Sequence, residues 1–332
     1  MTIQMAKDEP MNKKNSDKDK ANTKSVSGCT IPPADIKRVK GQGFLNHKRT
    51  NKFNARVITR NGRVTIDEMQ AICEAAAKYG DGHMMMTTRL TVEVSGIDYE
   101  NIEAFTACIE KAGLSIGGTG NKVRPVVSCK GTTCQYGNYD TYALSEEIHH
   151  RFYEGYRSVS LPHKFKIATG GCPNNCVKPN LNDVGIIGQR IPYFDREACK
   201  GCKKCAIEAA CPNKVAKVVD GKLHIDEELC RHCGRCVGKC PFHSIPDGTY
   251  GFKIYIGGRW GKKISHGKAL SKIFTSEEEA LDVIEKAILL FKDQGNKGER
   301  FAETIERIGF ENAEKQLLEK NLLERKSEIL SK

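Results

Sequence analysis

Cysteine is the residue type whose number and spacing in this sequence point most directly to chemistry. The chain has 332 residues and 15 cysteines, of which Cys29, Cys73 and Cys108 stand alone. The others fall in tight clusters. An odd count without an export signal argues against disulfides, because a reducing compartment keeps thiols free. We therefore expect a cytoplasmic metal-binding protein, in which the three single cysteines are small buried hydrophobes.

Two consecutive motifs hold the cysteines between residues 199 and 240. The first motif is C-x2-C-x2-C-x5-C-P and the second is C-x2-C-x2-C-x3-C-P. Three closely spaced thiolates can bind three irons of a cubane, and the distant cysteine before proline completes the cluster of the other motif. We expect one [4Fe–4S] cluster on Cys199, Cys202, Cys205 and Cys240, and a second on Cys211, Cys230, Cys233 and Cys236. Zinc is the alternative, but its paired knuckles leave no use for a third evenly spaced cysteine.

The segment 191–247 that contains both motifs resembles a bacterial two-cluster ferredoxin. It is internally repeated and short of apolar runs, whereas Phe252–Ile256 after it has the pattern of a strand. We interpret it as a module inserted into the main domain. The gap of five residues before Cys211 replaces the usual three and predicts a longer loop there.

A second constellation consists of two cysteine pairs about forty residues apart. Cys129 and Cys134 form one pair, and Cys172 and Cys176 form the other. Spacing alone leaves zinc knuckles open as an explanation. The surrounding residues favour another one. The run Lys-Phe-Lys-Ile-Ala-Thr-Gly-Gly-Cys-Pro-Asn-Asn-Cys, followed by Asp-Val-Gly-Ile-Ile-Gly, resembles the signature of siroheme-dependent sulfite and nitrite reductases.

The resemblance covers most of residues 53–310. It extends to Val-Arg-Pro-Val-Val-Ser-Cys, which ends at Cys129, to Thr-Thr-Arg89, and to Gly298-Glu-Arg-Phe301. The inserted segment and the single-repeat length are most similar to the siroheme-bearing C subunits of anaerobic sulfite reductases. The resemblance implies that a third [4Fe–4S] cluster is bound by Cys129, Cys134, Cys172 and Cys176, and that Cys176 also ligates the siroheme iron. The first pair departs from the family's usual C-x5-C by one residue.

Basic side chains are the second chemical feature, because sulfite is a dianion that must be neutralised and protonated. Lys164 and Lys166 alternate on a predicted strand, so both point to one face and Phe165 to the other. The resemblance implies that the substrate side of the siroheme is lined by Arg56, Arg124, Lys164 and Lys166. It implies that Arg89 pairs with siroheme carboxylates. Two departures stand beside these residues: Leu90 replaces a common Gln, and no Pro-Gly-Gly follows Arg56.

The elements that must position these residues follow an α+β pattern. Capping boxes at Thr65 and Ser276 predict helices that end at Gly80 and extend through Phe291. Further helices are expected at 101–111 and 142–157, strands at 84–94, 123–128, 164–169 and 184–187, and helices over the last 40 residues. The methionine run 84–86 is interpreted as packing, and His149 and His150 as surface residues.

The domain organisation follows from the same pattern and from the resemblance. The fold class is α+β, a siroheme/[4Fe–4S] sulfite reductase domain with an inserted bacterial-type 2[4Fe–4S] ferredoxin module. Residues 1–28 have the composition of a disordered basic tail. We expect a ferredoxin-like half-domain of nitrite and sulfite reductases at 29–115, a siroheme- and cluster-binding domain at 116–190, the inserted module at 191–247, and the return of the siroheme domain with C-terminal helices at 248–332.

Charge and composition agree with large anionic cofactors. Lys+Arg 53 against Asp+Glu 41 gives a net charge of +12. Three clusters and a siroheme would bring roughly −14, so no nucleic-acid partner is needed to explain the basic excess. No apolar run is long enough for a membrane span.

The resemblance implies an enzyme that reduces sulfite to sulfide with six electrons relayed through the ferredoxin-type clusters. Nitrite reduction to ammonia and an electron-transfer protein without siroheme are the alternatives. No nicotinamide-binding G-x-G-x-x-G follows a strand. We therefore expect donor subunits or proteins with flavin or iron–sulfur centres, and an oligomer.

Overall fold

The computed structural model describes residues 28–332, so the expected basic tail lies, apart from Gly28, outside the described residues. The N-terminal part is an antiparallel sheet with strand order β1-β2-β4-β3 and with β5 beside β2. Helices α2 and α3 share its core, which contains Phe53, Ile72 and Phe105. The elements are α1 Pro33–Gln42, β1 Phe44–Asn46, β2 Lys52–Ile58, α2 Ile66–Tyr79, β3 Met84–Met86, β4 Val92–Asp98, α3 Ile102–Lys111 and β5 Ser115–Ile116.

A second, mixed sheet follows with strand order β12-β11-β8-β7-β6. β6, β7 and β8 run parallel, whereas β11 pairs antiparallel with β8 and with β12. Because β6 and β7 are parallel neighbours, their carboxyl ends meet at one edge of the sheet. The elements are β6 Val127–Ser128, α4 Thr141–Ile148, β7 Ile167–Gly170, β8 Val184–Pro192, β11 Gly248–Ile256, β12 Lys268–Phe274 and α6 Glu277–Gln294.

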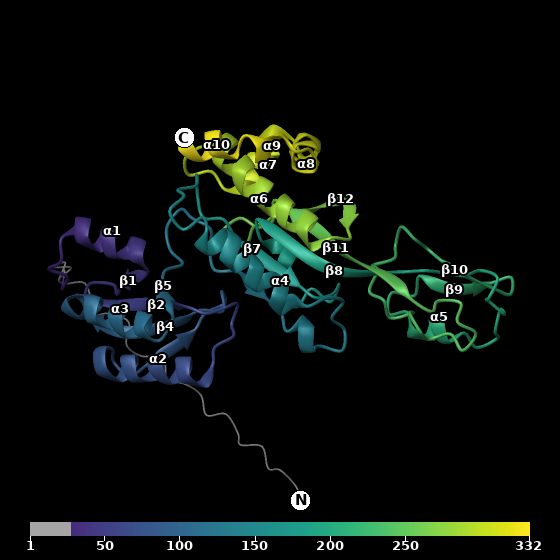
Figure 1. Ribbon diagram of the computed structural model, residues 1–332, viewed down its shortest axis with the longest axis horizontal. Helices are drawn as coiled ribbons and strands as arrows, with labels where there is room; N and C mark the ends of the chain where they lie inside the picture. The colour runs from purple at the N-terminus through teal and green to yellow at the C-terminus, as the bar shows by residue number, and fades with distance from the viewer. Residues whose placement is uncertain (1–27) are drawn as a thin grey trace, which may run out of the picture.

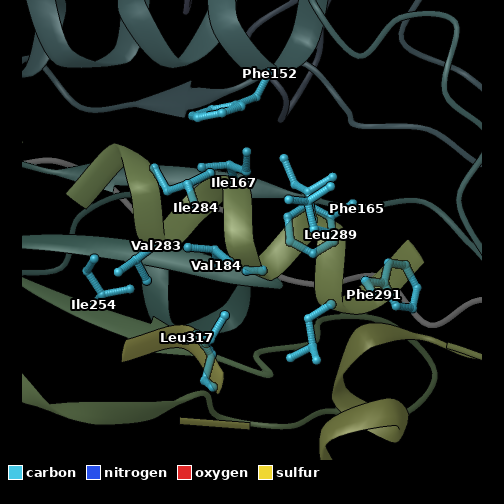
Figure 2. Close-up of a cluster of buried hydrophobic side chains, with 14 of the residues drawn as sticks. Phe152, Phe165, Ile167, Val184, Ile254, Val283, Ile284, Leu289, Phe291 and Leu317 are labelled. Atoms are coloured by element: carbon cyan, nitrogen blue, oxygen red, sulfur yellow. The ribbon is translucent and has the colours of Figure 1, made fainter. Parts of the chain in front are cut away.

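The core of this second unit lies between the sheet and α6. Figure 2 shows Phe165, Ile167, Val184 and Ile254 facing side chains of α6. The rings of Phe165 and Phe291 lie 5.8 Å apart between centroids. Four short helices cover α6 on its other side: α7 Phe301–Ile308, α8 Phe310–Leu318, α9 Asn321–Glu324 and α10 Lys326–Ser331. No helix among the described residues has the length and apolar character needed to cross a membrane.

The chain between β8 and β11 forms a separate projection. Gly248 pairs with Pro192, so the two strands form a stem from which residues 193–247 extend. Figure 1 shows this segment at one end of the molecule. It has its own small core around Ile207, Leu223 and Ile245. Its elements are α5 Ala206–Ala210, β9 Ala216–Val219 and β10 Lys222–Ile225.

Several expected strands are shorter than predicted. The run 84–94 is not one strand, because a turn at Thr87–Thr91 separates β3 from β4, with Leu90 at a φ of 57°. Of the expected strand 123–128, residues 127–128 form β6, and Val123 forms only an isolated parallel bridge with Phe165. Pro125 lacks the N–H that a ladder needs. β7 begins at Ile167, three residues after Lys164.

The helix predictions at residues 66–79 and 102–111 are confirmed. The expected helix 142–157 is α4 followed by a π-helix, η3 His149–Glu154. The interpretation of His149 as a surface residue is wrong, since it is only 4% exposed. The interpretation of the methionine run as packing holds for Met84, which packs against the N-terminal core, but is wrong for Met86, which is 71% exposed on the edge strand β3. Cys73, expected to be buried, is exposed.

The two expected capping boxes give a matched pair for a stability test. The Thr65 hydroxyl accepts a hydrogen bond from the Glu68 N–H at 3.1 Å, and the Glu68 carboxylate accepts one from the Thr65 N–H at 2.7 Å. The Ser276 side chain makes no capping bond, although α6 starts after it.

We expect Thr65→Ala to weaken α2 by about 1 kcal/mol because it removes a bond to an otherwise unpaired N–H. The same change at Ser276 should cost only a few tenths of that. Native-state hydrogen exchange of the α2 and α6 amides measures both effects. Equal losses at the two positions would show that the capping geometry has no energetic role.

Candidate functional site

The second cysteine constellation lies at the edge where β6 and β7 end. Cys129 follows β6, and Cys172 and Cys176 lie in the loop after β7. Cys134 follows a 3-10 turn, η2 Gly131–Thr133. Burial raises the pKa of the Cys172 thiol, and three neighbouring thiols raise it further, those of Cys129, Cys176 and Cys134. The structure thus brings the four predicted cysteines together, and Cys176 is the most exposed of them.

Glycines allow these loops to approach one another. A Cβ atom at Gly137 would lie 1.9 Å from the carbonyl oxygen of Gly131. One at Gly188 would lie 2.5 Å from the carbonyl oxygen of Gly171. The Gly171 N–H donates to the Cys129 sulfur at 3.1 Å. A side chain at either of the first two glycines would therefore separate the loops that carry the thiols.

The cysteines of the projecting segment form two further groups. One cavity is lined by Cys211 together with Cys230, Cys233 and Cys236. Burial raises the pKa of Cys236 to about 11, and Cys230, Cys233 and Cys211 add to the shift. Another cavity is lined by Cys199, Cys202, Cys205 and Cys240. Each cavity thus combines three cysteines of one motif with the fourth of the other, which is the arrangement that two [4Fe–4S] clusters need.

We call the first of these cavities the proximal cavity and the second the distal cavity. The gap of five residues before Cys211 forms the short helix α5 rather than an open loop. No set of three or more His, Cys, Asp or Glu side chains within residues 28–332 converges closely enough to hold a single metal ion. The thiols instead surround the cavities, which suits a group larger than one ion.

The proximal cavity faces the main body of the protein. The guanidinium of Arg235 lies over the ring of Tyr136, 4.3 Å from its centroid, and Tyr136 is two residues from Cys134. The backbone N–H of Arg190, in the stem, donates to the carbonyl oxygen of His232 at 2.8 Å. A further cavity is lined both by Pro173 of the Cys172–Cys176 loop and by Cys230. The proximal thiols therefore adjoin the loops of the second constellation.

Two of the predicted cations meet at one carbonyl oxygen. Arg56 on β2 donates to the Gly118 carbonyl at 3.0 Å, and Arg124 donates to the same oxygen. Arg56 also pairs with Glu93, its cross-strand neighbour on β4. The Nε of Arg124 is buried without a partner in the described part of the chain. Burial, with a contribution from Arg56, lowers the pKa of Arg124.

Arg89 occupies the hairpin turn between β3 and β4 and reaches into the second unit. Its guanidinium donates to the Asn182 side chain at 2.8 Å and to the carbonyl oxygens of Pro125 and Ile167. These contacts lock the turn against the loop that follows Cys176. The expected pairing of Arg89 with siroheme carboxylates remains a prediction.

Lys164 and Lys166 lie just before β7, and the expected alternation is confirmed because Phe165 between them is fully buried in the core. Burial lowers the pKa of Lys166 to about 8, and the nearby Arg89 and Arg300 add to this. Lys164 lies in the field of Arg300 and Arg124. Neither ammonium group has an ion-pair or hydrogen-bond partner in residues 28–332, so this face can accept an anion.

Two residues that the sequence analysis did not single out hold this face in place. Asp183, fully buried, accepts two hydrogen bonds of 3.0 Å from the Arg300 guanidinium. The same carboxylate accepts the Lys166 backbone N–H at 2.8 Å. Both residues lie inside motifs that carried the resemblance, Asp-Val-Gly and Gly-Glu-Arg-Phe. Their place in these motifs could have marked both residues as candidates. Nothing in the sequence, however, indicates that Asp183 and Arg300 form an ion pair.

Comparison with known proteins supports the chemistry of this site. The family profile "Nitrite and sulphite reductase 4Fe-4S domain" matches residues 119–326. The profile "Nitrite/Sulfite reductase ferredoxin-like half domain" matches residues 46–112. The first match covers more than half of the chain and includes the four cysteines of the second constellation.

Three relatives illustrate the similarity. An uncharacterised protein of Methanocaldococcus jannaschii is 31% identical over 78% of this chain and 89% of its own length. The coenzyme F420-dependent sulfite reductase of the same organism is 29% identical over 74% of this chain but only 38% of its own length. The C subunit of anaerobic sulfite reductase from Salmonella typhimurium is 31% identical over 64% of this chain and 66% of its own length.

A solved structure supports the fold. The crystal structure of dissimilatory sulfite reductase I superposes with a TM-score of 0.65 at 24% identity, over 80% of this chain and 69% of that chain. At this identity the likeness concerns the fold alone.

We expect Asp183→Asn to lower the free energy of unfolding by about 3–5 kcal/mol, because it leaves the buried Arg300 guanidinium without its counter-charge. Glu278→Gln breaks the exposed pair with Arg151 and should cost about 0–1 kcal/mol. Urea denaturation of both variants measures the difference. Adding Arg300→Met to Asp183→Asn should recover most of the loss, and a double variant as unstable as the single one would contradict the role of the pair.

Proposed function

We propose that this chain, which belongs to the nitrite and sulfite reductase family, is the siroheme-bearing subunit of a sulfite reductase. Its reaction would be the six-electron reduction of sulfite to hydrogen sulfide. The observation that carries the proposal is the pair of partly buried ammonium groups on Lys164 and Lys166, which form no ion pair in residues 28–332 and lie in the field of the Arg300 guanidinium.

The residues of the second constellation fit a [4Fe–4S] cluster with an attached siroheme. Four thiols converge, and Cys176, the predicted bridging ligand, is the one that is exposed. When bound, these groups would relay electrons from the donor and supply the redox-active iron for the reduction. Arg89, tied to Asn182 in the loop that carries Cys176, is positioned by the same loop. We assign it to the siroheme side of the site.

The chain's own contribution is charge and protons. Sulfite loses three oxygens as water, so each departing oxygen must be protonated. Lys166, with its pKa near 8, can both hold and release a proton close to neutral pH. Arg56 and Arg124, fixed on the Gly118 carbonyl, can bind the remaining oxygens.

We assign the projecting segment as an inserted two-cluster ferredoxin module. The proximal and distal cavities provide one site each, which gives three [4Fe–4S] clusters in all. The proximal thiols adjoin the loops of Cys134 and Cys172 through Tyr136 and Pro173, so this module is the natural path for electrons from a partner. The partner would be a flavin or iron–sulfur protein in the cytoplasm, and we expect an oligomer with it.

Nitrite reduction and pure electron transfer are the rival functions. Nitrite would use the same cations, but the relatives described above whose activity is named are sulfite reductases. A pure electron-transfer protein has no use for the converging cations Arg56 and Arg124 or for the ammonium groups of Lys164 and Lys166, which are unpaired in residues 28–332.

Acid–acetone extraction of the anaerobically purified protein should release siroheme. We expect Cys176→Ser to lose siroheme and the matching absorption bands, while the iron content falls by no more than the siroheme iron and the one cluster that Cys176 helps to bind. Cys202→Ser, in the distal cavity, should keep siroheme fully. Iron–sulfur absorption without any extractable tetrapyrrole, after expression with a siroheme supply, would favour the electron-transfer alternative.

The pH dependence of sulfite binding tests Lys166. Because its pKa lies near 8, the ammonium group is lost as the pH rises through that value, and the KM for sulfite should increase roughly fivefold between pH 8 and 9. Lys166→Arg keeps its charge over this range, so its KM for sulfite should show almost none of this rise between pH 8 and 9. The titration of sulfite itself affects both measurements equally. If KM depends on pH in the same way in wild type and in Lys166→Arg, Lys166 does not bind sulfite. Lys166→Met should abolish sulfite turnover with the clusters intact.

A further inference from the structure

The distal cavity lies under a strongly basic surface. Lys200 and Lys204 line the cavity itself. Lys222 donates its ammonium group to the Cys199 carbonyl at 3.0 Å, which fixes that lysine beside the cavity. Lys203 and Lys239 each adjoin a cavity-lining cysteine in sequence. All of these lysines are exposed, and we call them the lysine face: Lys200, Lys203, Lys204, Lys222 and Lys239.

The five lysines of the lysine face outnumber the acidic residues beside them in sequence. None of the five ammonium groups forms an ion pair within the described residues. The acidic residues close to them in sequence are Glu197, Glu208 and Asp220, so positive charge still dominates. Such a concentration of like charges on a small segment raises the energy of the free protein and favours a negatively charged partner.

The surface also has an apolar centre. Phe242 is 48% exposed and follows Pro241, which lines the distal cavity beside Cys240. A small apolar patch with a charged rim is typical of transient protein–protein contacts, in which charge steers the encounter and a small buried area allows rapid release.

The position of the distal cavity marks it as the outer end of the module. All of its lining residues belong to the segment 199–244. The proximal cavity, by contrast, adjoins the stem and the loops around Tyr136 and Pro173. Figure 1 shows the segment projecting away from both sheets, so a docked protein would meet no obstruction from them.

We propose that the lysine face is the docking surface for an acidic one-electron donor protein, which binds over the distal cavity with its reduced centre near Phe242. This inference rests on the proposed function, because it assumes that the distal thiols hold a cluster. In each encounter one electron would pass from the donor to that cluster. The donor would be oxidised by one unit, and no bond would form or break.

The test uses the full-length holoprotein and, as the donor probe, an acidic low-potential two-cluster ferredoxin that has been reduced and freed of excess reductant. Stopped-flow absorbance gives the second-order rate constant of cluster reduction, and calorimetry gives the affinity of the two oxidised proteins. We expect Lys200→Glu/Lys203→Glu/Lys204→Glu to lower the rate constant and the affinity at least about tenfold at low salt, and the difference to shrink in high salt.

A matched control variant reverses the charge of three exposed lysines of the N-terminal unit: Lys37→Glu/Lys48→Glu/Lys111→Glu. It changes the net charge of the protein equally and should leave both measurements within about twofold of wild type. Iron content and reduction by dithionite should be the same in all three proteins, because the small reductant needs no docking surface.

Each other outcome overturns the proposal. If the lysine-face variant binds the donor and accepts electrons like wild type, the lysine face is not the docking surface. If the control loses as much affinity and reduction rate as the lysine-face variant, the effect comes from net charge and not from a docking surface. In either case, normal iron content and normal reduction by dithionite leave the proposed sulfite reductase function intact. A wild-type protein that holds no clusters in the module would instead refute both the electron path through the module and the docking surface.

Discussion

The buried ion pair between Asp183 and Arg300 is the interaction on which the rest of the site depends. Asp183 stands at the start of β8, and Arg300 at the start of α7, so the pair joins the sheet to the C-terminal helices. The same carboxylate fixes the backbone of Lys166. A fully buried carboxylate is costly unless it is paired and hydrogen-bonded. Here it also offsets part of the repulsion among the cations that surround it.

That repulsion explains why the anchoring groups of the site are mostly carbonyl oxygens. Arg56 and Arg124 share the Gly118 carbonyl, and Arg89 uses the carbonyls of Pro125 and Ile167. Carbonyl dipoles can orient a guanidinium without cancelling its charge. Arg89 and Arg124, which form no ion pair among the described residues, therefore keep a positive field that can attract an anion, whereas Arg56 is also paired with Glu93. Carboxylates at every arginine would have stabilised the free chain at the expense of binding.

The features that could be predicted from the sequence are those set by local spacing. The Thr65 capping box defines the start of α2, and the interleaved cysteine motifs predict which thiols line the proximal and distal cavities. The features that were missed depend on contacts between distant segments. Nothing local to residues 84–94 shows that the chain turns at Leu90 to direct Arg89 into the second unit. The burial of His149 has no local signal either, because it results from a π-helical turn packed against the second unit's core.

The insertion point of the module follows from the same geometry. β8 and β11 are antiparallel neighbours, so a short hairpin could have joined them at Pro192 and Gly248. Extending that hairpin leaves the sheet register unchanged, which is why an extra module can be accommodated without altering the core around α6. The stem also fixes its orientation, because Arg190 on β8 binds the backbone at His232. One end of the projecting segment is thereby held against the loops of Cys134 and Cys172, and the opposite end lies away from them.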